Sequence, residues 1–233
     1  MHQRWHDLLF AHWPVAPEQL LPRVPAGLAL DLYEGQAWIS VVPFRMTGVR
    51  LYRQPVAAPW VGAFPELNVR TYVTPAGGGK PGVLFFSLDA GNPVAVAAAR
   101  RWFHLPYFYA RMRLRREGDE IIYQSRRVHP GAPAALFDAR YRPTGPPYTA
   151  PPGSLDDWLT ARYCLYTTDR AGRLYRCDIA HQPWPLQPAE GVLRFNMLTR
   201  QHGIRLPDQP PLLQFARRLD IVAWPLVPVE SRE

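Results

Sequence analysis

The chain has 233 residues, of which 47% are hydrophobic and 12% aromatic, enough apolar material for a folded core without disulfides or metal ions. Its net charge is +8, but no aromatic and basic motif of a known nucleic-acid reader accompanies the basic residues, so nucleic-acid binding is not favoured. No apolar run approaches the roughly 18 residues of a membrane span, and the N-terminal apolar run is too short for a signal peptide. We therefore expect one cytoplasmic domain covering residues 1–233.

The first elements are short and interrupted by proline. Residues 17–21 are typical of a helical turn, and residues 28–33 and 36–45 are typical of strands joined at Glu34-Gly35. Residues 51–63 contain prolines and predict a loop.

The next segment alternates almost strictly and predicts a strand over residues 66–73. One face carries Leu67, Val69, Thr71 and Val73, and the other carries Glu66, Asn68, Arg70 and Tyr72. We expect the apolar face to pack under a helix or another strand.

Residues 83–88 are apolar enough for a strand buried on both faces, and they should pair with residues 66–73 as a hairpin. Asn92 and Pro93 then predict a helix start over residues 94–103, because asparagine is a good N-cap and proline suits the first helical position. Pro106 ends this helix directly before Tyr107.

The rest of the chain predicts mainly strands. These cover residues 107–116, 120–127, 136–142, 163–168, 173–179 and 213–224, and helices are predicted over residues 155–161, capped by Ser154, and 189–200. Alternation would place Arg111, Arg113 and Arg115 on one solvated face. A long meander of strands must close or curl to protect its edges, so we expect a mainly β fold with a few helices, in which an antiparallel barrel or cone encloses a cavity.

The two cysteines belong to the hairpin predicted around Asp169–Gly172. Closing that hairpin symmetrically places Cys164 opposite Cys177 as cross-strand neighbours. Reduced thiols packed side by side are the favoured interpretation in a cytosolic protein, with a disulfide and a metal site as weaker alternatives.

Four segments, in this order, resemble one family of bacterial proteins. They are residues 5–14 (WHDLLFAHWP), 64–73 (FPELNVRTYV), 104–112 (HLPYFYARM) and 181–186 (HQPWPL). Together they are similar to the YqjF-like proteins, a family of unknown function in the acetoacetate decarboxylase-like superfamily. The resemblance implies a cone-shaped antiparallel β-barrel with a central cavity.

The same resemblance bears on mechanism. In acetoacetate decarboxylase, a helix leads into a segment whose first lysine forms a Schiff base with the substrate, and a second lysine lowers its pKa. The matching positions here are Tyr107 and Phe108, and a phenol cannot form an imine. The chain has one lysine, Lys80, in a glycine-rich turn that is more typical of an exposed hairpin. We therefore expect no Schiff-base decarboxylation.

The polar face of residues 66–73 is the candidate ligand-binding surface. If it points into the cone, Arg70 can clamp an anion, Glu66 can exchange a proton or hold the arginine, and Asn68 lies between them. The alternative is that this face is simply the solvated side of a strand. Tyr107 and His104 are the other candidates, although His104 could equally cap the end of its helix.

No cofactor is expected, and no group of His, Cys and carboxylate residues has metal-ligand spacing. Three functions remain open. The first is a binding protein for a small organic acid or an apolar metabolite, and the second is an enzyme using Glu66 as acid or base, Arg70 as anion clamp and Tyr107 as proton donor. The third is a basic protein that binds anions or nucleic acid, and the sequence also leaves a homo-oligomer open.

Overall fold

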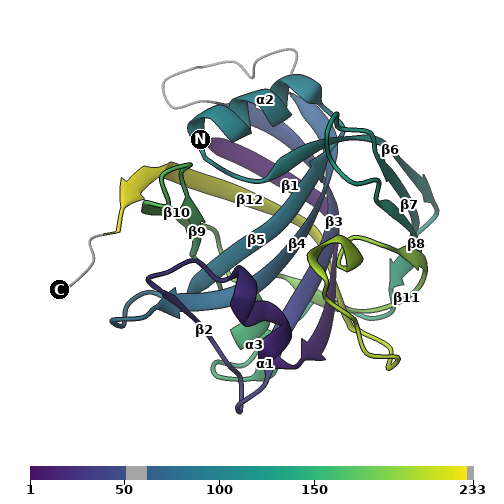
Figure 1. Ribbon diagram of the computed structural model, residues 1–233. Coiled ribbons are helices and arrows are strands. Elements are labelled where there is room, and N and C mark those ends of the chain that lie inside the picture. The colour runs from purple at the N-terminus through teal and green to yellow at the C-terminus, as the bar shows by residue number, and fades with distance from the viewer. Residues whose placement is uncertain (51–61, 230–233) are drawn as a thin grey trace.

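The structure, a computed structural model, describes residues 1–50 and 62–229, so most of the predicted loop 51–63 lies outside the described residues. Within them, strands dominate and helices are few, as predicted (Figure 1). The strands are β1 (His2–Val15), β2 (Leu28–Leu30), β3 (Ala37–Arg50), β4 (Ala63–Pro75), β5 (Gly82–Ala90), β6 (Tyr107–Glu117), β7 (Glu120–Arg127), β8 (Leu136–Pro143), β9 (Cys164–Thr168), β10 (Leu174–Ala180), β11 (Leu186–Asn196) and β12 (Leu212–Pro228). The helices are α1 (Pro17–Leu20), α2 (Pro93–Trp102) and α3 (Leu155–Thr160), with 3-10 turns at Leu21–Arg23 and Arg200–His202.

The strands form a 12-stranded sheet that returns on itself. Following the pairings, β1 lies beside β3, then β4, β5, β9, β10 and β12, and β12 pairs with β1 again. This closed ring is the predicted barrel. Its pairings are antiparallel except that β5 runs parallel to β9, as it also does to β6.

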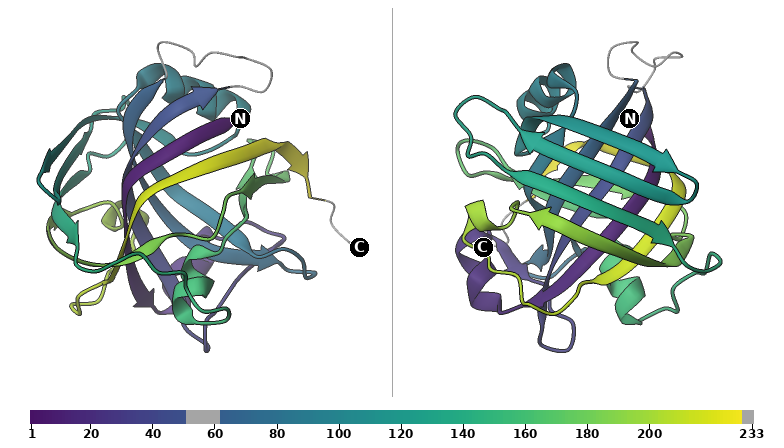
Figure 2. Two further views of the ribbon diagram at one scale, coloured as in Figure 1. Left: turned by 180° about the vertical axis from the view of Figure 1, so that it is seen from behind. Right: turned by 90° about the vertical axis from the view of Figure 1, so that its right-hand side faces the viewer.

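A second layer covers one side of the ring. Strands β6, β7, β8 and β11 lie across the outside of β1, β3 and β4 (Figure 2, right). The main apolar core lies between them, and it joins Leu67 and Val69 of β4 to Tyr123 of β7 and Phe137 of β8. The apolar face of β4 therefore packs under other strands, as predicted, while the outer face of β6 leaves Arg111 and its neighbouring arginines exposed.

Helix α2 forms where its sequence signals place it, to within one residue. The Asn92 side chain accepts hydrogen bonds from the backbone N–H groups of Val94 and Ala95, and Pro93 is the first helical residue. The helix lies across one end of the ring, and α3 lies toward the other end (Figure 1). No helix in the described part of the chain is long and apolar enough to cross a membrane.

Two predictions of secondary structure were wrong or missing. The helix predicted over residues 189–200 is instead the strand β11, which pairs with β8 and β12. Gly191 lies so close to β8 that an added Cβ would be 2.7 Å from the Arg140 carbonyl oxygen, so this strand pairing depends on a glycine. Helix propensity alone treats the same glycine only as a weak helix former. The N-terminal segment, for which no element was predicted, is the long strand β1.

The predicted register of the cysteine hairpin was also wrong. Thr168 pairs with Leu174, which leaves five residues in the turn, so the register moves by one residue relative to a symmetric closure. Cys164 consequently lies opposite Asp178, and Cys177 lies opposite Leu165. Because directly opposed residues share a face, the two cysteines point to opposite faces of the sheet, and both are free.

Candidate functional site

A cavity of about 180 Å³ lies inside the ring, beneath α2. Every strand of the ring contributes to its wall, and α2 contributes Ala95, Ala98 and Ala99. Most of the lining is apolar. It includes Phe64, Phe85, Leu88, Leu105, Leu165 and Ile221. A cavity of this size and character suits a small, largely apolar molecule.

Glu66 and Tyr107 place a polar pair in this apolar wall. The Tyr107 hydroxyl donates a hydrogen bond of 2.8 Å to Oε2 of Glu66, and Glu66 is only 2% exposed. Burial raises the pKa of the Glu66 carboxyl to about 8, although the hydrogen bond from Tyr107 opposes part of this shift. Burial and the nearby carboxyl also raise the pKa of Tyr107 well above its usual value. Both groups are therefore mainly protonated at pH 7.

The pair is held by the strands around it. Tyr107 begins β6, which pairs with Leu88 of β5, and Glu66 pairs with Ala90 at the end of the same strand. On the other side, the buried hydroxyl of Tyr123 donates a hydrogen bond of 2.6 Å to the Glu66 carbonyl oxygen. Strand β5 thus brings the two side chains together across a sequence separation of 41 residues.

Asn68 also lines the cavity, two residues further along the same face of β4. Its side chain is buried, and its Oδ1 atom has no hydrogen-bond partner among the described residues. A buried amide oxygen without a partner costs free energy, so it is a ready acceptor for a donor on a bound molecule.

Arg70 lies on the same face but beyond the cavity lining. It is 7% exposed, its Nη2 atom is 3.4 Å from the Leu159 carbonyl oxygen, and its guanidinium carbon lies 5.3 Å from the centre of the Phe10 ring. Within residues 1–50 and 62–229 it has no carboxylate partner at salt-bridge distance. The predicted anion clamp is therefore a buried positive charge next to the cavity and not part of its wall.

A hydrogen-bonded group near Arg70 was not predicted. Ser40 Oγ lies 2.6 Å from Nδ1 of His12 and 2.7 Å from the hydroxyl of Tyr72, and all three side chains are buried. Burial, and next the charge of Arg70, lower the pKa of His12 well below its usual value, so its ring is neutral. The position of Tyr72 on the polar face of β4 was the available signal, but no local pattern links it to His12 and Ser40.

His104 and Lys80 lie away from the cavity. His104 follows α2 with a positive φ of 52°, and its ring lies 5.6 Å from that of Tyr175. It lines a surface groove outside the barrel and not the cavity. Lys80 forms an ion pair of 2.8 Å with Asp178 at a partly exposed site. Neither residue is brought together with Glu66 and Tyr107. Among the described residues, no group of three or more His, Cys, Asp or Glu residues could hold a metal ion.

The closed ring and its internal cavity define a protein of the acetoacetate decarboxylase-like fold. Solved structures agree over nearly the whole chain: acetoacetate decarboxylase from Legionella pneumophila matches with a TM-score of 0.60 at 15% identity, covering 97% of this chain and 86% of that one. The enduracididine biosynthesis enzyme MppR complexed with pyruvate matches with a TM-score of 0.65 at 12% identity, covering 98% and 90%. At such low identities these matches show the fold alone.

The family follows from closer matches. The model of the DUF2071 family, described as an uncharacterized conserved protein, matches residues 2–220, and the chain belongs to this family. Uncharacterized protein YqjF of Bacillus subtilis (strain 168) is 53% identical over 226 residues, which cover 97% of this chain and 91% of that protein. The resemblance read from the four sequence segments is confirmed.

Proposed function

We propose that this protein binds a small organic acid or a largely apolar carbonyl compound in the cavity beneath α2, without forming a Schiff base. The observation that carries the proposal is the Glu66–Tyr107 pair in the cavity wall. It is a buried carboxyl with a pKa of about 8, hydrogen-bonded to a phenol and surrounded by apolar side chains.

The chemistry of the pair suggests what it recognises. Oε2 of Glu66 already accepts the hydrogen bond from Tyr107, so the proton of the neutral carboxyl is available for an acceptor on the ligand. A carbonyl or carboxylate oxygen is such an acceptor, and the low dielectric of the cavity strengthens the bond. The unpartnered Oδ1 of Asn68 accepts a hydroxyl or a protonated group of the same ligand.

Arg70 supports a preference for acids over neutral compounds. It lies on the same face of β4 beyond Asn68, and no carboxylate in the described part of the chain neutralises it. With Glu66 neutral, this side of the barrel interior carries net positive potential. We therefore assign Arg70 an electrostatic role, in place of the direct clamp expected from the strand alone.

The absence of Schiff-base chemistry is part of the proposal. It is supported by Tyr107 at the position of the decarboxylase lysine and by Lys80 in its ion pair with Asp178, away from the cavity lining. Incubation with pyruvate or acetoacetate followed by borohydride reduction is expected to give no adduct on Lys80 by peptide mass spectrometry. An adduct mapped to Lys80 would overturn this part of the proposal.

A second candidate function is proton transfer at a carbonyl compound. The pKa of Glu66 is close to neutral pH, where a residue that both gives and takes a proton is most effective. Tyr107 can donate its hydroxyl proton to the reacting oxygen in place of its present hydrogen bond to Glu66. Exchange of the methyl protons of pyruvate in D2O, followed by NMR, tests it. Faster exchange with the wild type than with Glu66→Gln supports catalysis, and equal rates support binding alone.

Binding itself is tested by ligand-observed NMR, with pyruvate as the first probe because MppR was solved in complex with it. The variant Ala98→Trp fills the cavity from α2, and Val94→Trp places the same side chain at an exposed position of the same helix. Small acids and ketones are expected to bind the wild type and Val94→Trp but not Ala98→Trp. Equal binding by both folded variants would place the ligand elsewhere.

A further inference from the structure

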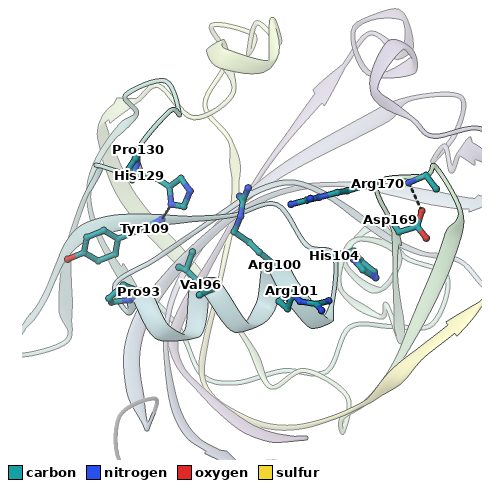
Figure 3. Close-up of a pocket in the computed structure, with 12 residues that line it drawn as sticks. Pro93, Val96, Arg100, Arg101, His104, Tyr109, His129, Pro130, Asp169 and Arg170 are labelled. Atoms are coloured by element: carbon teal, nitrogen blue, oxygen red, sulfur yellow. Dashed lines mark hydrogen bonds between the residues drawn. The ribbon is translucent and has the colours of Figure 1, made fainter.

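A wide groove of about 860 Å³ runs along the outer side of α2, separate from the cavity. Basic side chains reach it from three places: Arg100 and Arg101 from α2, Arg170 from the turn between β9 and β10, and His129 from the segment after β7. Figure 3 shows Arg100 rising from the helix and Arg170 reaching toward it from the turn. Segments distant in sequence therefore concentrate positive charge on one hollow.

The positive charge of this groove exceeds the negative charge beside it. Arg101 and Arg170 make no ion pair with any described residue. Asp169 also lines the groove, but its carboxylate accepts hydrogen bonds from the backbone N–H groups of Ala171 and Arg173, both at 2.9 Å. These bonds close the turn and lower the pKa of Asp169, so Asp169 stays ionised and adds one negative charge to a wall that carries three arginines.

Two further donors have fixed positions. Nδ1 of His129 accepts a hydrogen bond of 3.1 Å from the backbone N–H of Tyr109, which leaves its Nε2–H as a donor. Burial and the nearby arginines lower the pKa of His129, in keeping with this neutral form. Arg100 is held by a hydrogen bond of 2.7 Å to the Tyr107 carbonyl oxygen and by its place over the Phe108 ring.

His104 adds a strained backbone at the same groove. Its φ of 52° is in the left-handed region, which residues other than glycine rarely adopt. Such strain persists where the surrounding structure requires it, and it is often found at binding sites. Here it directs the chain from the end of α2 into β6 and leaves the imidazole in the groove wall.

We propose that this groove binds the phosphate group of a small soluble organic phosphate. One guanidinium group can donate hydrogen bonds to two phosphate oxygens at once. Arg101 and Arg170 come from different elements of the fold, an arrangement that suits a group with several acceptor oxygens. Pro93, Val96 and Ala97 give the groove an apolar floor for the organic part of the ligand. The site is independent of the cavity, since α2 presents Ala95, Ala98 and Ala99 to the cavity and these other residues to the groove.

Isothermal titration calorimetry with ATP, pyrophosphate and adenosine, at constant ionic strength, tests the proposal. The wild type is expected to bind ATP and pyrophosphate saturably and adenosine far more weakly. The double variant Arg101→Gln/Arg170→Gln should weaken ATP binding at least about tenfold, because two charge-assisted contacts are lost. The matched control, Arg113→Gln/Arg115→Gln on the exposed face of β6, removes the same charge and should leave the affinity unchanged.

Two results would overturn the groove assignment. One is the absence of saturable phosphate binding by the wild type up to about 10 mM, which corresponds to less than about 3 kcal/mol of binding free energy. The other is equal weakening in the two double variants, which would mean a nonspecific response to net charge. Pyruvate binding measured on the same proteins separates this proposal from the cavity, because the groove variants should retain it.

Discussion

The hydroxyl of Tyr107 and the carboxyl of Glu66 meet inside the barrel at 2.8 Å, in the wall of an otherwise mainly apolar cavity. Burial raises the pKa of both groups, so the pair presents neutral hydrogen-bonding groups in an apolar environment. A phenol beside a protonated carboxyl is an arrangement that can stabilise negative charge developing on an oxygen.

The first prediction concerns stability against pH. Glu66 has a pKa of about 8 in the folded protein and about 4.5 when unperturbed, so the folded state holds its proton more tightly. As far as this group is concerned, stability should be highest below pH 4.5, fall as the pH rises from there through 8, and level off above it, by roughly 5 kcal/mol in total. In Glu66→Gln this part of the fall should vanish, as measured by denaturant unfolding at a series of pH values. The exposed Glu190→Gln is the control and should keep the wild-type profile.

The second prediction concerns the hydrogen bond itself. Because the bond from Tyr107 favours the ionised carboxylate, Tyr107→Phe should raise the pKa of Glu66 further. It should also lower the free energy of unfolding by about 1 kcal/mol near neutral pH, the usual value of one buried hydrogen bond. Tyr109→Phe offers a comparison, as no hydrogen bond of its hydroxyl to a described residue is found. Equal losses of unfolding free energy in the two variants would mean that the hydrogen bond from Tyr107 to Glu66 does not stabilise the fold.

A third prediction contrasts two buried arginines. Arg127 forms an ion pair of 2.6 Å with Asp89, both almost fully buried, so Arg127→Met leaves a buried carboxylate alone and should cost about 3–5 kcal/mol. Arg70 has no acidic partner among the described residues, so Arg70→Met should be neutral or stabilising. Thermal unfolding checks both, and a large loss in Arg70→Met would reveal a stabilising role that its contacts do not explain. In binding assays Arg70→Met should weaken acids more than neutral ketones.

The fourth prediction uses two glycines around the lysine turn. An added Cβ at Gly82 would lie 2.7 Å from Sγ and 2.8 Å from the carbonyl oxygen of Cys164, whereas a Cβ at Gly77 meets nothing within 4 Å. Gly82→Ala should therefore destabilise the protein by about 1–3 kcal/mol, through overpacking where β5 pairs with β9. Gly77→Ala should be close to neutral. Chemical denaturation of both variants distinguishes a packing effect from a general effect on the hairpin.

Much of this architecture could be predicted because it rests on local patterns. The alternation of β4 correctly placed Leu67 and Val69 on the packed face, and Asn92 with Pro93 correctly located the start of α2. Strand β11 could not be predicted in the same way, since its identity depends on long-range pairing around Gly191. The predicted register of the cysteine hairpin was wrong by one residue. Because side chains alternate between the two faces of a strand, this shift places the two cysteines on opposite faces.

The site shows the same division. That Glu66, Asn68 and Arg70 share a face follows from spacing. The position of Arg70 outside the cavity lining, next to the Leu159 carbonyl oxygen of α3, does not follow from any local pattern. His104 and Tyr107 are three residues apart, and the positive φ of His104 separates them into two different hollows. Nothing in the sequence signals a left-handed histidine at that point.

The protonation state of Glu66 is the most direct test of this account. A carbon-13 NMR titration of glutamate side-chain carboxyls, with the Glu66 signal assigned by its loss in Glu66→Gln, measures its pKa in the folded protein. We predict a value of about 8, with a proton still bound at pH 7. A value below about 5, ordinary for a solvated glutamate, would contradict the neutral pair and the ligand chemistry proposed from it.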